Sequence, residues 1–173
     1  DACLLMIGEQ IGASDATKNF TVRKQTELSR EGFAGRLPRS GVGLYIHGFN
    51  TRYQEALYRA VQLSVDAHLE GAPVQIVHDS GAQVTPVLFT WPSAGNAGAY
   101  LADRDASDFS RAALADLLGL LTKNRRSSEP VPVLAHSMGA RLTMETLVQL
   151  RLGPFALRNR FAVEFRRREL AGA

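Results

Sequence analysis

The stretch Val131-Pro-Val-Leu-Ala-His-Ser-Met-Gly-Ala140 contains a short apolar run, small residues around a serine, and the start of an amphipathic segment. This pattern is typical of a strand, a sharp turn and a helix that together expose a nucleophilic serine, usually written G-x-S-x-G. The flanking residues must be small, because the turn strains the serine backbone and brings strand and helix close together. Here they are Ala135 and Gly139, so Ser137 is the candidate nucleophile. A serine that only caps the following helix is the alternative.

A second strand, loop and helix precede this stretch. Val42-Gly-Leu-Tyr-Ile46 is an apolar run of β-forming residues, and it ends in His47-Gly-Phe-Asn50. Thr51 and Gln54 have the spacing of a capping box, and apolar residues recur at helical spacing from Leu57 to Val65. We therefore predict a strand over 42–46 and a helix that begins near Thr51.

The remaining elements are predicted from periodicity and from turn residues. The polar segment from Lys24 to Arg39, interrupted by glycines and a proline, predicts a loop. Pro132 must lie at a strand start or a bulge, because proline cannot donate to a sheet. We predict strands at 2–7, 20–22, 74–77 and 84–91, the last two as a hairpin, a helix at about 105–121, and a helix after Ser137 with Ala140, Met144, Leu147 and Val148 on one face, ending at Gly153-Pro154.

Strand and helix units that alternate in this way, with strands too apolar for a one-sided sheet, imply a mostly parallel sheet with helices on both faces. The active site of such a fold lies at the carboxyl ends of the strands, where both His47 and Ser137 are expected. The 173 residues are enough for a single domain, with its core motif region at 42–152.

A serine hydroxyl becomes an effective nucleophile only with a base nearby and with donors for the oxyanion that forms. The backbone N–H of Met138, directly after the candidate nucleophile, is one expected donor. The second is expected from the loop after an earlier strand, where we assign the N–H of Phe49, with Gly48 allowing the backbone to approach substrate. A glycine turn with a packing aromatic is the alternative for this loop.

Composition excludes several other classes of protein. Lys and Arg number 20 against 17 Asp and Glu, and no basic face interleaved with aromatics suggests nucleic-acid binding. No apolar run is long enough for a membrane span, and the single Cys3 excludes an internal disulfide. Neither metal-ligand spacing nor a glycine-rich phosphate loop is present, so we expect no metal and no cofactor. The compartment stays open with the cytoplasm favoured, and the start at Asp1 suggests a processed or truncated N-terminus.

Five motifs occur in order: His47–Asn50, Glu55–Tyr58, Phe89–Ser93, Tyr100–Arg104 and Ala135–Gly139. Together they resemble a bacterial alpha/beta-hydrolase family of unknown function, over roughly Val42 to Leu150. The resemblance implies the alpha/beta-hydrolase fold and a Ser-Asp-His serine hydrolase, but it does not supply the substrate. For a serine hydrolase of this type we expect a small-molecule ester, thioester or related acyl substrate. We assign substrate binding to His47, Gly48, Asn50, Trp91 and His136, with simple packing as the alternative for the tryptophan.

One departure from this pattern concerns the catalytic triad. In alpha/beta hydrolases the acid and the histidine follow the serine, whereas residues 138–173 contain neither histidine nor aspartate. His47 suits loop structure better than a general base, and Asp103 suits a helix start with salt bridges. We therefore expect a C-terminally truncated domain that is nearly inactive alone and that self-associates through an uncovered sheet edge. A non-catalytic binding domain or a degenerate hydrolase remnant is the alternative.

Overall fold

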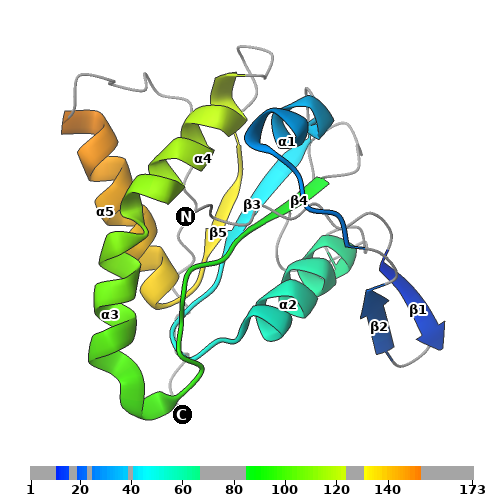
Figure 1. The fold of residues 1–173 in the computed structure, drawn as a ribbon, viewed down its shortest axis with the longest axis horizontal. Coiled ribbons are helices and arrows are strands. Elements are labelled where there is room, and N and C mark those ends of the chain that lie inside the picture. The colour runs from blue at the N-terminus through cyan, green and yellow to red at the C-terminus, as the bar shows by residue number, and fades with distance from the viewer. Residues whose placement is uncertain are drawn as a thin grey trace, which may run out of the picture.

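The computed structural model describes residues 11–15, 19–22, 25–38, 41–66, 85–123 and 131–152 (Figure 1). Its elements are, in chain order, β1 (Ile11–Asp15), β2 (Asn19–Val22), α1 (Arg30–Arg36), β3 (Val42–Ile46), α2 (Tyr53–Asp66), β4 (Thr85–Phe89), the 3₁₀ helix η1 (Ala97–Ala99), α3 (Tyr100–Phe109), α4 (Arg111–Lys123), β5 (Val133–Ala135) and α5 (Met138–Leu152).

The central sheet is parallel and has the strand order β4-β3-β5. Ile46 at the end of β3 is paired with Phe89 of β4 and with Ala135 of β5. The three strands therefore end at the same edge, and the loops that follow them meet there. β1 and β2 form a separate antiparallel pair.

Helices cover both faces of this sheet, which confirms the predicted fold class. On one face, Val42, Leu44 and Ile46 pack in a buried cluster with Phe33 of α1, the leucines of α4 and Leu142 of α5. On the other face, Tyr45 and Leu88 pack against Ala56 and Ala60 of α2. Figure 1 shows α2 on one side of the strands and α3, α4 and α5 on the other. Because helices cover both faces, the strands are mostly apolar.

The predicted loop over Lys24–Arg39 was wrong, since it contains α1. Ser29 caps this helix by accepting a hydrogen bond of 3.1 Å from the N–H of Gly32. Phe33 anchors the helix in the core and is almost completely buried. The cap and the buried aromatic side chain outweigh the low helix propensity of two glycines.

The single helix predicted over 105–121 is two helices, α3 and α4, with the break at Ser110. The Ser110 hydroxyl donates to the carbonyl of Ala106 at 2.8 Å, which satisfies the end of α3. The start of α2 also differs, because Glu55 rather than Gln54 accepts a hydrogen bond, at 3.0 Å, from the N–H of Arg52. Apolar spacing does not reveal either feature, because polar side chains that bond to the backbone set both of them.

The buried face of α5 is also different from the predicted one. Met144 and Val148 are exposed, whereas Leu142, Thr143 and Thr146 are buried. Both threonine hydroxyls donate to carbonyls one turn earlier, at 2.7 Å in each case. Threonine can occupy a buried helix face when its hydroxyl is satisfied in this way, and a search for apolar residues does not detect it.

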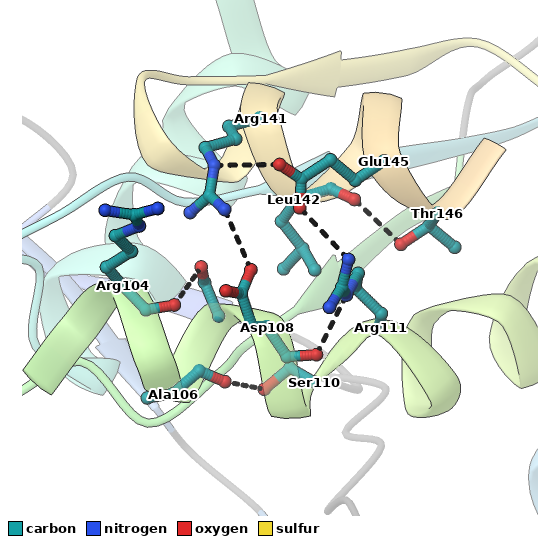
Figure 2. A network of polar contacts seen from close by, with 10 residues as sticks. Arg104, Ala106, Asp108, Ser110, Arg111, Arg141, Leu142, Glu145 and Thr146 are labelled. Carbon is teal, nitrogen blue, oxygen red and sulfur yellow. Dashed lines mark hydrogen bonds and ion pairs between the residues drawn. The ribbon is translucent and has the colours of Figure 1, made fainter. Parts of the chain in front are cut away.

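A group of ion pairs joins α3 and α4 to the first turns of α5 (Figure 2). The Nη2 atom of Arg141 lies 3.0 Å from Asp108 and its Nε atom 2.9 Å from Glu145, which Arg111 also approaches at 3.4 Å. These side chains are about one-third exposed, so each pair contributes at most about 1 kcal/mol. Their effect is to fix the helix that starts directly after Ser137.

The other predicted elements fall into two groups. Phe20–Val22 lies within β2, and β5 begins directly after Pro132, both as expected. The strands at 2–7 and 74–77, the hairpin turn and the Gly153-Pro154 helix end lie outside the described residues. None of the described helices combines the length and apolar character needed to cross a membrane.

We expect Leu118→Ala to lower the free energy of unfolding by about 2–5 kcal/mol, because the side chain is completely buried in the main core. Leu101→Ala is the matched control, since 71% of that side chain is exposed, and we expect a change within about 0.5 kcal/mol. Urea unfolding of both variants measures the difference. Equal effects would contradict the described core.

Candidate active site

Three loops meet at the carboxyl edge of the sheet, one after each parallel strand. The loop after β5 is tied to β3, because the N–H of His136 donates to the carbonyl of Ile46 at 3.0 Å. The loop after β4 is tied to the loop after β3, because the indole N–H of Trp91 donates to the carbonyl of His47 at 3.0 Å. Segments far apart in the sequence are thus held together at this edge.

Ser137 lies at the tight turn between β5 and α5. Its φ angle is +52°, a left-handed conformation that is uncommon for a residue other than glycine. The residue is exposed, and its carbonyl accepts hydrogen bonds from the N–H groups of Ala140 and Arg141. Among the described residues, none makes a hydrogen bond to its hydroxyl. The turn therefore leaves Ser137 exposed at the cost of backbone strain.

Glycines allow the loops after β3 and β5 to approach each other. A Cβ atom on Gly139 would overlap the carbonyl oxygen of His47 and lie 2.9 Å from that of Ile46. A Cβ atom on Gly48 would lie 2.6 Å from Nδ1 of His136 and 3.0 Å from Cβ of Ser137. The His47–Asn50 and Ala135–Gly139 motifs are therefore in direct backbone contact.

The His47 side chain is completely buried beneath this contact. Its ring is stacked on Trp91, with centroids 5.1 Å apart and planes at 8°. Nδ1 lies 2.9 Å from the carbonyl of Gly48, and Nε2 lies 3.1 Å from the hydroxyl of Thr90 and 3.2 Å from the N–H of Trp91. A carbonyl can only accept and an amide can only donate, so Nδ1 carries the proton and Nε2 accepts.

Burial lowers the pKa of His47 below its usual value of 6.5, because the charged imidazolium loses its hydration. The bond to the Gly48 carbonyl and the negative charge of Asp103 act in the opposite direction. The imidazole is therefore neutral near pH 7, and both ring nitrogens have partners within the protein. The side chains of His47 and Trp91 therefore pack in the interior beneath the loop after β3 and do not face solvent.

Asp103 of α3 is a site residue whose role was not predicted from the sequence, where a helix start with salt bridges was expected. The carboxylate is buried and accepts hydrogen bonds from the Ser93 hydroxyl at 2.6 Å, the Ala94 N–H at 2.7 Å and the Asn50 N–H at 3.4 Å. It thereby joins the loops after β3 and β4. In the sequence, the one signal for this role is the position of Asp103 after a loop of small residues.

The exposed rim of the site consists of the loop after β3 and the start of α3. The Phe49 ring meets the Tyr100 ring edge to face, with centroids 5.4 Å apart. Asn50 is exposed and also has a positive φ angle, +53°. His136 is exposed beside Ser137, whereas Met138 is buried as the first residue of α5. In the described ranges, no group of three His, Cys, Asp or Glu side chains could hold a metal ion.

A parallel sheet covered by helices on both faces, with a strained, exposed serine between a strand and a helix, is the arrangement found in alpha/beta hydrolases. Residues 25–163 match the family described as "Alpha/beta hydrolase of unknown function (DUF900)", and the chain belongs to this family. No curated protein and no solved structure has a significant match to the chain.

The lowered pKa of His47 predicts how stability depends on pH. Below about pH 6.5 the unfolded chain takes up a proton on this histidine before the folded protein does, so stability is lost as the pH falls further. In His47→Gln this contribution is absent. We expect the difference in unfolding free energy between the native protein and the variant to shrink below pH 6.5, by at most about 1.4 kcal/mol per pH unit. Urea unfolding between pH 8 and 5 measures it, and a difference independent of pH would contradict this prediction.

Two helical glycines provide a matched test of the backbone contact. Gly119 of α4 has open space around a new Cβ atom, so Gly119→Ala should stabilise the protein by up to about 1 kcal/mol through helix propensity. Gly139→Ala, in the first turn of α5, gains at most as much propensity and collides with the His47 carbonyl. We expect it to be net destabilising in thermal unfolding. A stabilising effect of both substitutions would show that the loops are not in contact.

Proposed function

We propose that the protein is a serine hydrolase in which Ser137 attacks the acyl carbon of an ester, thioester or related substrate. The single observation that carries this proposal is an exposed serine at a positive φ angle, whose Cβ atom lies close to Gly48. A serine that only capped α5 would need neither the strained backbone nor the glycine opposite it. The strain is consistent with a turn maintained for its chemistry.

The oxyanion donors follow from the same geometry. Met138 is the first residue of α5, and the first N–H groups of a helix have no partner inside it and lie at its positive end. We assign the N–H of Phe49, from the loop after β3, as the second donor. Gly48, Asn50 and His136 form the rim that contacts the substrate, while His47 and Trp91 hold this rim in place.

We assign neither the base nor the acid of a triad to the residues described around the site. Both nitrogens of His47 are occupied, and residues 138–173 contain no histidine or aspartate. Loss of a triad base typically lowers turnover by a factor on the order of 10⁴–10⁶. We therefore expect very slow ester hydrolysis by the 173-residue chain on its own.

Added imidazole can replace a missing general base, which allows Ser137 to be tested in this chain. We expect a fluorophosphonate probe to label Ser137 faster as the imidazole concentration rises, with the modified peptide identified by mass spectrometry. Ser29, an exposed serine whose hydroxyl caps α1, is the control within the same molecule and should stay unlabelled. In Ser137→Ala the imidazole-dependent labelling should disappear.

Equal labelling of Ser137 and Ser29, or no labelling of Ser137 with imidazole present, would contradict the enzymatic proposal. The alternative is a non-catalytic binding domain on the same scaffold. A non-catalytic domain predicts that Ser137 stays unlabelled even with imidazole present.

A further inference from the structure

We propose that His47 is a positioning residue that orients the Phe49 N–H toward the oxyanion by holding the carbonyl of Gly48. This inference rests on the proposed function of Ser137. It assigns a role to a buried histidine that neither contacts the substrate nor exchanges a proton with it.

The first step concerns the peptide bond between Gly48 and Phe49. Its carbonyl and its N–H belong to one planar trans unit and point in opposite directions. The carbonyl accepts a hydrogen bond of 2.9 Å from Nδ1 of His47, which is completely buried. The N–H of Phe49 therefore points away from the buried imidazole. Fixing one end of this unit fixes the direction of the other.

The second step concerns the imidazole itself, which is held on three sides. Nε2 accepts from the N–H of Trp91 at 3.2 Å, so the proton must be on Nδ1, where the Gly48 carbonyl needs it. The ring is also stacked on the indole, which prevents it from tilting. The indole N–H in turn donates to the His47 carbonyl, so the side chain and the backbone of His47 are both anchored.

The third step explains why glycine precedes Phe49. Any side chain at position 48 would collide with His136 and Ser137, so the loop has no Cβ atom to limit its rotation there. Glycine also has the greatest conformational freedom of all residues. Without a hydrogen bond to its carbonyl, the peptide unit beside Ser137 could rotate. The hydrogen bond from His47 therefore restrains the rotation of the Gly48–Phe49 peptide unit.

Two substitutions test the roles of the two ring nitrogens of His47 separately. His47→Asn places an amide nitrogen near the position of Nδ1 and can still donate to the Gly48 carbonyl. His47→Gln reaches the position of Nε2, where its amide oxygen can accept from Trp91, but it leaves the Gly48 carbonyl without a donor. Each variant keeps one of the two hydrogen bonds, so a role in stability alone would not rank them in a fixed order.

The experiment measures imidazole-dependent fluorophosphonate labelling of Ser137 in the 173-residue chain. We expect His47→Asn to retain the native rate within about threefold and His47→Gln to lose roughly 10- to 100-fold, less than or similar to the loss of an oxyanion donor. The loss should be in the maximal labelling rate constant, with the probe concentration at half-maximal rate unchanged. Equal rates in the two variants, or a slower rate for His47→Asn, would overturn the inference.

A second measurement does not depend on reactivity at Ser137 or on the folding of a variant. In ¹⁵N NMR spectra of the native chain at pH 7.5, we expect the His47 proton on Nδ1 and a non-protonated Nε2. A proton on Nε2 would overturn the inference even if Ser137 is labelled. If the native chain shows the expected tautomer but no labelling, the proposed function fails while the described hydrogen bonds stand.

Discussion

The close approach of α5 to the end of β3 is the constraint on which the site depends. At Gly139 the helix backbone lies so near the carbonyls of Ile46 and His47 that no side chain fits between them. This contact sets where α5 begins, and therefore forces the turn before it to be tight, with Ser137 at a positive φ angle. The strain at one residue is balanced by the packing of a whole helix against the sheet, as Leu142 shows by its complete burial.

Buried polar groups, rather than apolar contacts, hold the loops around this turn. The side chains of His47, which is stacked on Trp91, and of Asp103 are buried. Each forms hydrogen bonds with backbone groups of the loops after β3 or β4. Loops at the end of a sheet have unpaired backbone groups that must find partners when they are buried. Two polar side chains meet this need here and at the same time fix the position of the Phe49–Asn50 segment beside Ser137.

The elements predicted correctly are those whose signal is local. β3 and β5 are apolar runs, and α5 follows a turn of small residues, so their existence and parallel arrangement could be inferred from pattern. The errors arose where a polar group decided the outcome. α1 exists because of the cap at Ser29 and the burial of Phe33, and the inner face of α5 includes Thr143 and Thr146, whose hydroxyls bond to the helix itself.

The sequence by itself determined the family of the chain, the parallel fold and the identity of the candidate nucleophile, because small residues at positions 135 and 139 and a glycine at position 48 have a steric meaning that needs no coordinates. Only the tertiary structure decided what His47 and Asp103 do. The tautomer of a histidine and the role of an aspartate depend on which groups lie against them, and for each side chain one of those groups comes from a loop more than 40 residues away in the chain.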